Sequence, residues 1–143
     1  MKKTISILGS TGSVGLSSLK IIDKEKKLFK IYLLSANKNL KLSLRQINKY
    51  KPNFFIVSNT DTFKKLKKKI KNKKTKILNN FSQIKSKKKI DITISAIPGI
   101  AGLTPTIKMT KLSKKILIAN KESVICGWNL IKNSATRNKT KVI

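Results

Sequence analysis

Three glycines stand three residues apart near the start of the chain, in the segment GSTGSVG at residues 9–15. These residue types suit a loop that binds phosphate, because Gly9 permits a tight turn and Gly12 lets the backbone approach an anion. Gly15 lets the next helix pack closely on a strand, and the free N–H groups at the start of that helix face the anion. Further donors would come from the hydroxyl groups of Ser10, Thr11 and Ser13. The segment therefore predicts a pyrophosphate-binding turn, against the alternative of a purely structural turn.

The segments on both sides of this loop are the elements that such a site requires. The apolar run Thr4–Leu8 predicts a short buried strand, and the residues from Val14 to about Lys27 predict a helix. A glycine triplet alone is a weak signal. A strand directly before it and a helix directly after it favour dinucleotide binding.

The rest of the chain alternates between strand spacing and helix spacing. Strands are predicted at Phe29–Ala36, Phe54–Val57, Lys76–Leu78, Ile90–Ala96 and Ile116–Ala119, and another begins within Lys139–Ile143. Helices are predicted between them, on apolar stripes that start at Leu40, Phe63, Leu103 and Val124, the last ending near Lys132. Asp61 is expected to cap the helix that carries Phe63. Repeated strand–helix units predict an α/β fold: one Rossmann-like, doubly wound domain, with a mostly parallel sheet and helices on both faces.

The end of the second predicted strand bears on the choice of cofactor. Sites for NAD place an acid about 20 residues beyond the glycine loop, where it holds the ribose hydroxyl groups. Here the strand is followed by Asn37-Lys38-Asn39, and no acid stands between Glu25 and Asp61. Lys38 is placed to meet a 2′-phosphate, although it is also one lysine among many. The missing acid is the stronger observation, and it predicts NADP(H) rather than NAD(H).

Two later loops also follow predicted strands. The loop Ser95–Gly102 is small and glycine-rich, so that a nicotinamide or a substrate could lie against its backbone. Asn120, Lys121 and Glu122 follow the Ile116–Ala119 strand and combine an amide, an ammonium and a carboxylate. Asn120 and Glu122 are candidates for hydrogen bonds to the cofactor, and Lys121 is a candidate for contact with an anionic substrate. The alternative is a local ion pair that caps the next helix.

The charge of the chain is strongly positive, since 34 Lys and Arg against five Asp and Glu give a formal net charge of +29. Such a charge would favour nucleic acid or an anionic membrane on electrostatic grounds. Arginine, however, stands only at Arg45 and Arg137, and we interpret the lysines as solvent-facing residues of a biased composition. No run of about 18 apolar residues occurs and no signal peptide is recognised, so we expect a cytoplasmic protein. Cys126, the only cysteine, is expected to be buried and structural because the chain has no His.

Taken together, the motifs resemble the 1-deoxy-D-xylulose 5-phosphate reductoisomerase family. The resemblance rests on Ile7–Gly15, on Ser35–Asn39 and on Leu117–Ser123, whose order and spacing match over the whole chain. It implies an NADPH-dependent enzyme of non-mevalonate isoprenoid biosynthesis that converts 1-deoxy-D-xylulose 5-phosphate to 2-C-methyl-D-erythritol 4-phosphate. The NADPH contacts would fall on Thr11, Gly12, Ser13, Val14, Asn37, Lys38, Asn39, Asn120 and Glu122, and the substrate contact on Lys121.

The resemblance also implies what this chain lacks. The family binds Mg or Mn through an Asp-Ser-Glu segment that would follow Ile143. We therefore expect residues 1–143 to be an NADPH-binding domain, truncated before the metal-binding catalytic domain, with no metal site and no catalytic residues of its own. A sugar phosphate substrate and a homodimer are implied for the full-length enzyme. Asn37 stands where the family usually has glycine, and it tolerates the left-handed conformation. Pro98 replaces a small aliphatic residue beside the nicotinamide.

Two alternatives stay open on sequence alone. Another NADP-dependent oxidoreductase with the same loop, such as a semialdehyde dehydrogenase, would use a catalytic cysteine with a histidine, which Cys126 lacks. A basic nucleic-acid-binding module would instead bind DNA or RNA with a steep dependence on salt.

Overall fold

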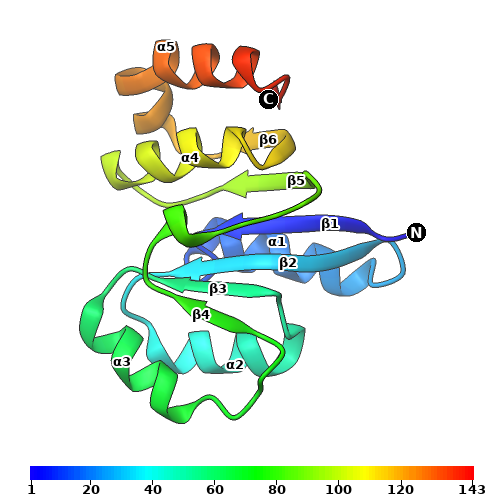
Figure 1. The fold of residues 1–143 in the computed structure, drawn as a ribbon, viewed down its shortest axis with the longest axis vertical. Coiled ribbons are helices and arrows are strands. Elements are labelled where there is room, and N and C mark those ends of the chain that lie inside the picture. Colours follow the sequence, from blue (N-terminus) through cyan, green and yellow to red (C-terminus); the bar gives the residue numbers. More distant parts are fainter.

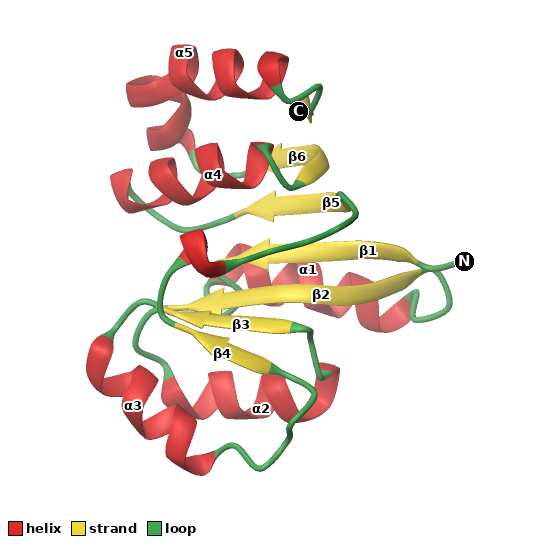
Figure 2. Cartoon of the chain, in the orientation of Figure 1, coloured by secondary structure: helices red, strands yellow, loops and turns green.

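Seven parallel strands form one sheet at the centre of the computed structural model, which describes residues 1–143 (Figure 1, Figure 2). The strands are β1 (Lys3–Leu8), β2 (Phe29–Ala36), β3 (Phe54–Val57), β4 (Lys76–Leu78), β5 (Ile90–Ser95), β6 (Ser113–Ile118) and β7 (Lys141–Val142). Their order across the sheet is β4-β3-β2-β1-β5-β6-β7, and every neighbouring pair is parallel. The chain builds outward from β1 to β4 and then returns to the other side of β1, so that the predicted doubly wound topology is confirmed.

Helices cover both faces of the sheet, as predicted. They are α1 (Ser13–Lys24), α2 (Leu40–Tyr50), α3 (Thr60–Lys69), α4 (Leu103–Thr110) and α5 (Lys121–Arg137), with short 3-10 turns η1 (Phe81–Gln83) and η2 (Ile100–Gly102). One buried cluster joins the sheet to α1, α2 and α3 through Leu19, Ile47 and Leu66. A second cluster on the other face contains Met109 of α4, and α5 packs against α4 and β7. Because each face is covered, the strands carry apolar residues on both sides, which explains their unbroken apolar runs.

Asparagine side chains cap three of the helices. Asn39 accepts a hydrogen bond from the Leu42 N–H at 3.0 Å, and Asn59 accepts one from the Thr62 N–H at 3.0 Å. Asn120 caps α5 in the same way. The prediction that Asp61 caps α3 is wrong, because Asp61 lies inside the first turn of that helix. Its carboxylate still interacts favourably with the positive end of the α3 helix dipole.

The last helix differs most from its prediction. It runs over Lys121–Arg137 instead of Val124–Lys132, and it bends at Gly127. Gly127 lies against Leu103 of α4, whose Cδ1 atom would be 2.2 Å from an added Cβ atom. Since Gly127 takes the position next to α4, the preceding Cys126 is exposed, and the prediction of a buried cysteine is wrong. The first helix is also shorter than predicted and ends at Lys24.

No helix here combines the length with the apolar composition that a membrane span needs.

Hydrogen bonds join β1 to β5, and an ion pair joins β5 to β6, near the points where these strands begin. The Asp91 carboxylate accepts hydrogen bonds from the Thr4 N–H at 2.9 Å and from Lys114 Nζ at 2.8 Å. The bond from Lys114 and the bond from the Thr4 backbone lower the pKa of Asp91 to about 2. A carboxylate whose pKa is lower in the folded chain stabilises the fold above its unfolded pKa, and this stability disappears as the pH falls through the folded pKa.

We expect Asp91→Asn to lower the free energy of unfolding at neutral pH by about 1–2 kcal/mol, a value reduced for partial solvent exposure. The loss should shrink between about pH 4 and pH 2, because the wild-type carboxylate is itself protonated there. Urea unfolding followed by circular dichroism over this pH range measures the effect. Glu25→Gln is the matched control, since it removes an exposed acid that forms no ion pair and lies outside the first turn of any helix. Equal losses in both variants would contradict the assignment.

Candidate functional site

The glycine loop lies where the direction of sheet building reverses, between the ends of β1 and β5. Gly9 follows β1 with a φ of +80°, a left-handed conformation that favours glycine. A Cβ atom on Gly9 would lie 2.7 Å from the carbonyl oxygen of Ala96, directly after β5. The predicted tight turn is therefore confirmed, and the turn also needs a residue without a side chain. Ligands of open α/β sheets bind at such reversal points, beyond the carboxyl ends of the strands.

The start of α1 leaves backbone donors free. Its N-cap residue, Gly12, provides no side-chain hydrogen bond, unlike the asparagine caps of α2, α3 and α5. Gly12 is exposed, and an added Cβ atom would have only the Gly9 carbonyl oxygen nearby, at 3.6 Å. Gly15 is packed tightly against the Gly9 and Ser10 backbone. The first N–H groups of a helix have no partner within it, so those of α1 are available to an anion.

Ser10 does not face an anion, contrary to the prediction that it adds a donor. Its side chain is fully buried, and its hydroxyl donates to Gln46 Oε1 at 2.6 Å and lies 3.1 Å from the Ser35 carbonyl oxygen. Gln46 Nε2 in turn donates to the Ser10 carbonyl oxygen at 3.0 Å. The Gly9 N–H donates to Ser35 Oγ at 3.0 Å. Ser10 thus fixes the loop to β2 and α2, and only Thr11 and Ser13 keep their hydroxyl groups on its outer side.

A pocket of about 460 Å³ opens at this edge of the sheet. It is lined by Gly9, Thr11, Gly12, Ser35, Ala36, Asn37, Ser58, Phe81, Ile97, Pro98, Ala101 and Pro105. Three of the predicted cofactor-binding residues, Thr11, Gly12 and Asn37, are among them. Ser58 and Phe81 were missed by the sequence analysis. Ser58 follows β3 as Asn37 follows β2, and ligands of such sheets bind beyond the carboxyl ends of the strands, so the sequence could have indicated Ser58. No sequence signal places Phe81 at the pocket.

The residues after β2 reach the rim of the pocket. Asn37, Lys38 and Asn39 are all exposed, and Ser58 donates a hydrogen bond to Asn37 Oδ1 at 3.0 Å. Asn37 does not have a positive φ, so the expected left-handed conformation is not used. The Asn39 side chain caps α2, as described above. Lys38 forms no ion pair, and its ammonium is free to meet a ligand.

Asn120 connects the two later loops. Its Nδ2 donates to the carbonyl oxygens of Ile97, at 2.5 Å, and Gly99, at 2.7 Å, while its Oδ1 accepts from the Ser123 N–H. The side chain is buried, and it holds the Ile97–Gly99 segment against the start of α5. Lys121 is exposed and Glu122 half-buried in the first turn of that helix, and neither lines the pocket. Lys121 and Glu122 form no ion pair with each other, which argues against the alternative that they are a local ion pair capping α5.

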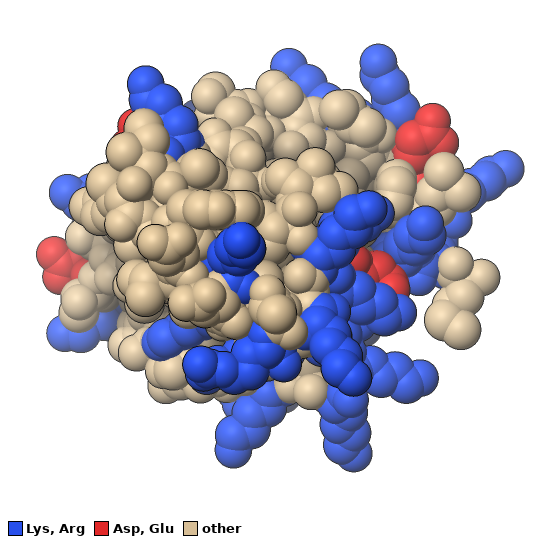
Figure 3. All heavy atoms as spheres, turned by 90° about the horizontal axis from the view of Figure 1, so that it is seen from above, with Lys and Arg blue, Asp and Glu red and all other residues tan.

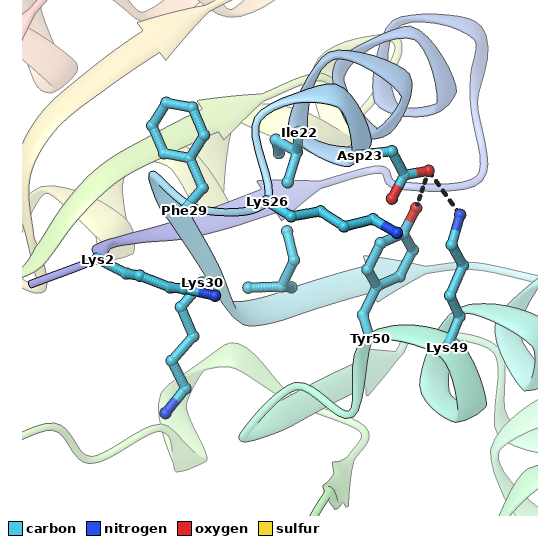
Figure 4. Close-up of a pocket in the computed structure, with 9 residues that line it drawn as sticks. Lys2, Ile22, Asp23, Lys26, Phe29, Lys30, Lys49 and Tyr50 are labelled. Carbon is cyan, nitrogen blue, oxygen red and sulfur yellow. Dashed lines mark hydrogen bonds and ion pairs between the residues drawn. The ribbon is translucent and has the colours of Figure 1, made fainter.

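A second hollow of about 450 Å³ lies at the opposite edge, where strands begin (Figure 4). Its charged side chains are Lys2, Asp23, Lys26, Lys30 and Lys49. Asp23 accepts hydrogen bonds from Lys49 Nζ at 2.5 Å and from the Tyr50 hydroxyl at 3.1 Å. Burial raises the pKa of Asp23, but these two hydrogen bonds outweigh it and the pKa is lowered overall. The only acid in this hollow is therefore ionised and paired.

No group of three or more His, Cys, Asp or Glu side chains comes together to hold a metal ion in residues 1–143. Asp91 lies near the start of β5 and Glu122 in the first turn of α5, so they do not converge.

Comparison with known proteins identifies relatives over nearly the whole chain. The sequence model of the 1-deoxy-D-xylulose 5-phosphate reductoisomerase family matches residues 5–127. The reductoisomerase of Pelagibacter ubique is 46% identical over 96% of this chain and 37% of its own length. That of Buchnera aphidicola is 41% identical over 98% of this chain and 36% of its own length. A crystal structure of DOX-P reductoisomerase in complex with NADPH, fosmidomycin and magnesium superposes with a TM-score of 0.89 at 29% identity, over 98% of this chain and 35% of that one. The chain thus spans little more than a third of these relatives.

We expect Gln46→Leu to lower the free energy of unfolding by about 1–3 kcal/mol, because it leaves Ser10 with unpaired buried polar groups. Ser10→Ala should destabilise by a similar amount, and the double variant should cost less than the sum of the two. Urea unfolding of the three variants measures this coupling. Gln83→Leu is the matched control, because Gln83 is exposed and its side chain forms no hydrogen bond. Strictly additive losses would contradict a shared network.

Proposed function

The chain belongs to the 1-deoxy-D-xylulose 5-phosphate reductoisomerase family, and we propose that residues 1–143 are the NADPH-binding domain of such an enzyme. The full-length enzyme would convert 1-deoxy-D-xylulose 5-phosphate to 2-C-methyl-D-erythritol 4-phosphate in non-mevalonate isoprenoid biosynthesis. The family match favours this function over the other oxidoreductases that the glycine loop alone would allow. It also makes a dedicated nucleic-acid-binding module the weaker explanation of the chain as a whole.

The observation that carries the proposal is the uncapped start of α1. Its free N–H groups, the open backbone at Gly12 and the hydroxyl groups of Thr11 and Ser13 together form an anion site of the kind that binds a pyrophosphate. Val14 is exposed in the same first turn and would contact the cofactor beside the phosphates. The hydrogen bonds of Ser10 and Gln46 would keep this loop in place when the cofactor leaves.

The adenosine end of the cofactor would lie beyond β2. Asn37 and Ser58 line the pocket there, and Lys38 stands next to them with its charge unpaired. No acid occupies the position that holds the ribose of NAD, and a lysine suits a 2′-phosphate. Asn39 would contribute through its backbone, since its side chain caps α2. We therefore propose NADPH as the cofactor.

The nicotinamide end would approach the loop after β5. Ile97, Pro98 and Ala101 give the pocket an apolar wall on that side, which supports the stacking of a nicotinamide ring. Asn120 would act there by holding this loop, and Glu122 by a hydrogen bond to the cofactor. Lys121 is exposed and would contact the phosphate of the substrate.

Metal-dependent steps would depend on residues outside residues 1–143. The family resemblance implies Mg or Mn, and a divalent ion would act as a Lewis acid on the substrate oxygens. The DOX-P reductoisomerase structure that contains NADPH also contains magnesium. Residues 1–143 offer no cluster of carboxylates for such an ion. We propose that this chain supplies cofactor binding and Lys121, within a cytoplasmic homodimer of the full-length enzyme.

We expect Gly12→Asp to weaken NADPH binding by about 100-fold, because a carboxylate would occupy the phosphate position and repel the cofactor. The fold should be retained, since the space beside Gly12 is open. Fluorescence titration with NADPH measures the affinity, and thermal unfolding measures the stability.

Ser17→Asp is the matched control, because it adds the same charge to an exposed position on the same helix. This control should bind NADPH within about threefold of the unchanged chain, as expected for a screened charge beyond the first turn. If Gly12→Asp binds NADPH normally, the proposed phosphate site is wrong.

We expect Lys38→Ser to reduce the preference for NADPH over NADH by about tenfold or more, because a charged hydrogen bond to the 2′-phosphate would be lost. Parallel titrations with the two nucleotides give the ratio of their affinities. Lys41→Ser removes an exposed lysine from the next helix turn and should leave this ratio unchanged. A ratio that is the same in both variants would show that Lys38 does not read the phosphate.

A further inference from the structure

Lysines are distributed unevenly between the two edges of the sheet. We call the edge at which strands end the carboxyl edge, and the edge at which strands begin the amino edge. The loops that follow strands at the carboxyl edge, residues 9–12, 37–39, 58–59, 79–80, 96–99 and 119–120, contain one lysine, Lys38. The segments that lead into strands, residues 1–2, 25–28, 51–53, 70–75, 84–89, 111–112 and 138–140, contain 13 lysines. Four of these lie in residues 84–89, which cross the face of the sheet from η1 at the carboxyl edge to the start of β5 at the amino edge (Figure 1). A composition bias alone would place lysines at both edges.

Three acids at the amino edge, Asp23, Glu25 and Asp91, leave most of its lysines without an opposite charge. Asp23 and Asp91 are paired with Lys49 and Lys114, which lie in α2 and β6. None of the 13 segment lysines forms an ion pair. Lys2 and Lys26 line the hollow of Figure 4, and their ammonium groups lie on the same side of the molecule as the strand starts. In Figure 3, Lys and Arg side chains are more numerous on the right, the side where the strands of Figure 1 begin, than on the left, and they also cover the lower side of the view.

The dimensions of this edge suit an extended polyanion better than a small one. A sheet of seven strands spaced about 4.8 Å apart is roughly 29 Å wide. A nucleic-acid duplex carries about one negative charge per 1.7 Å of its axis, so a segment of this length carries roughly 17 phosphates, of which those on the facing side would meet this edge. A single phosphate group would engage only a small part of it.

The side chains between the lysines distinguish the possible polyanions. Proteins that bind single strands use exposed aromatic rings on which bases stack, whereas the only strongly exposed aromatic ring, that of Trp128, lies on α5. Insertion into a membrane needs exposed apolar side chains among the basic ones. At the amino edge the exposed apolar side chains are Met1 and Leu28, which lie together before β1 and β2. The lysines continue well beyond them, from the segment before β4 to the segment before β7.

We propose that the amino edge binds the phosphate backbone of double-stranded nucleic acid without reading its sequence. Lysine supplies point charges, and the near absence of arginine removes the residue that most often reads guanine. Because this edge lies opposite the pocket at the carboxyl edge, a duplex and a dinucleotide could be bound together. The proposal for this edge does not depend on the proposed enzyme function.

The test is fluorescence anisotropy with a labelled DNA duplex of about 20 base pairs between about 50 and 200 mM salt. The unchanged chain should lose about 10³-fold in affinity over this range. The triple variant Lys27→Gln, Lys74→Gln and Lys88→Gln removes three exposed lysines from the amino edge. It should bind about tenfold or more weakly and lower the slope of log K against log salt by about 2–3.

The matched control is Lys20→Gln, Lys64→Gln and Lys132→Gln, which removes the same charge from the middle of α1, α3 and α5. It should bind the duplex within about twofold of the unchanged chain, since distant charges are screened. A second edge variant at Lys26, Lys71 and Lys111 should behave like the first, and thermal unfolding of all variants should be similar because these lysines are exposed.

Equal weakening in edge and control variants would overturn the proposal, because only net charge would then matter. Binding that does not fall with salt would overturn it as well. Sedimentation with vesicles of phosphatidylserine and phosphatidylcholine tests the membrane alternative, and capture by vesicles without binding to the duplex would overturn it too.

Discussion

A short set of buried hydrogen bonds fixes the turn on which the candidate site depends. Ser10, Ser35 and Gln46 join the end of β1 to the end of β2 and to α2, and every polar group in the set is paired. Buried hydrogen bonds of this kind are costly to break singly, so they hold one loop geometry. That geometry places the uncapped start of α1 in solvent, beside the pocket, and leaves its N–H groups to a ligand.

The same topology gives the two edges of the sheet different chemistry. All strands are parallel, so helices start at the carboxyl edge and end at the amino edge. Helix starts attract anions and helix ends attract cations. Small residues and asparagines therefore suit the first edge, where a ligand must approach the backbone. Lysines suit the second edge, where they face the negative ends of the helix dipoles and where few acids stand.

Asn120 shows how a residue can serve a site without facing the pocket. Its amide bridges the loop after β5 and the first turn of α5, and thereby sets the wall that the proposed nicotinamide would contact. Gly102 must be small because an added Cβ atom would lie 2.4 Å from that amide. The relatives that share this segment are more than twice as long as the chain. In the proposed enzyme, residues 1–143 would supply cofactor binding, and metal binding would depend on residues outside this range.

The sequence alone predicted the order of the strands, the helix faces and the glycine turn, because these follow from local residue spacing and from the freedom of glycine. The strand predicted at Ile116–Ala119 is observed as β6 at Ser113–Ile118, because its polar start lacks an apolar run. The bounds of β2 were predicted to the residue, since an unbroken apolar run has clear ends. The sequence could not show that the Ser10 side chain points inward to Gln46, that Gly127 packs against α4 where Cys126 was expected to be buried, or that Phe81 lines the pocket. Those contacts join residues far apart in the chain. The tertiary structure alone also decided that lysines gather toward the amino edge, because this edge forms only when the parallel strands align in one sheet.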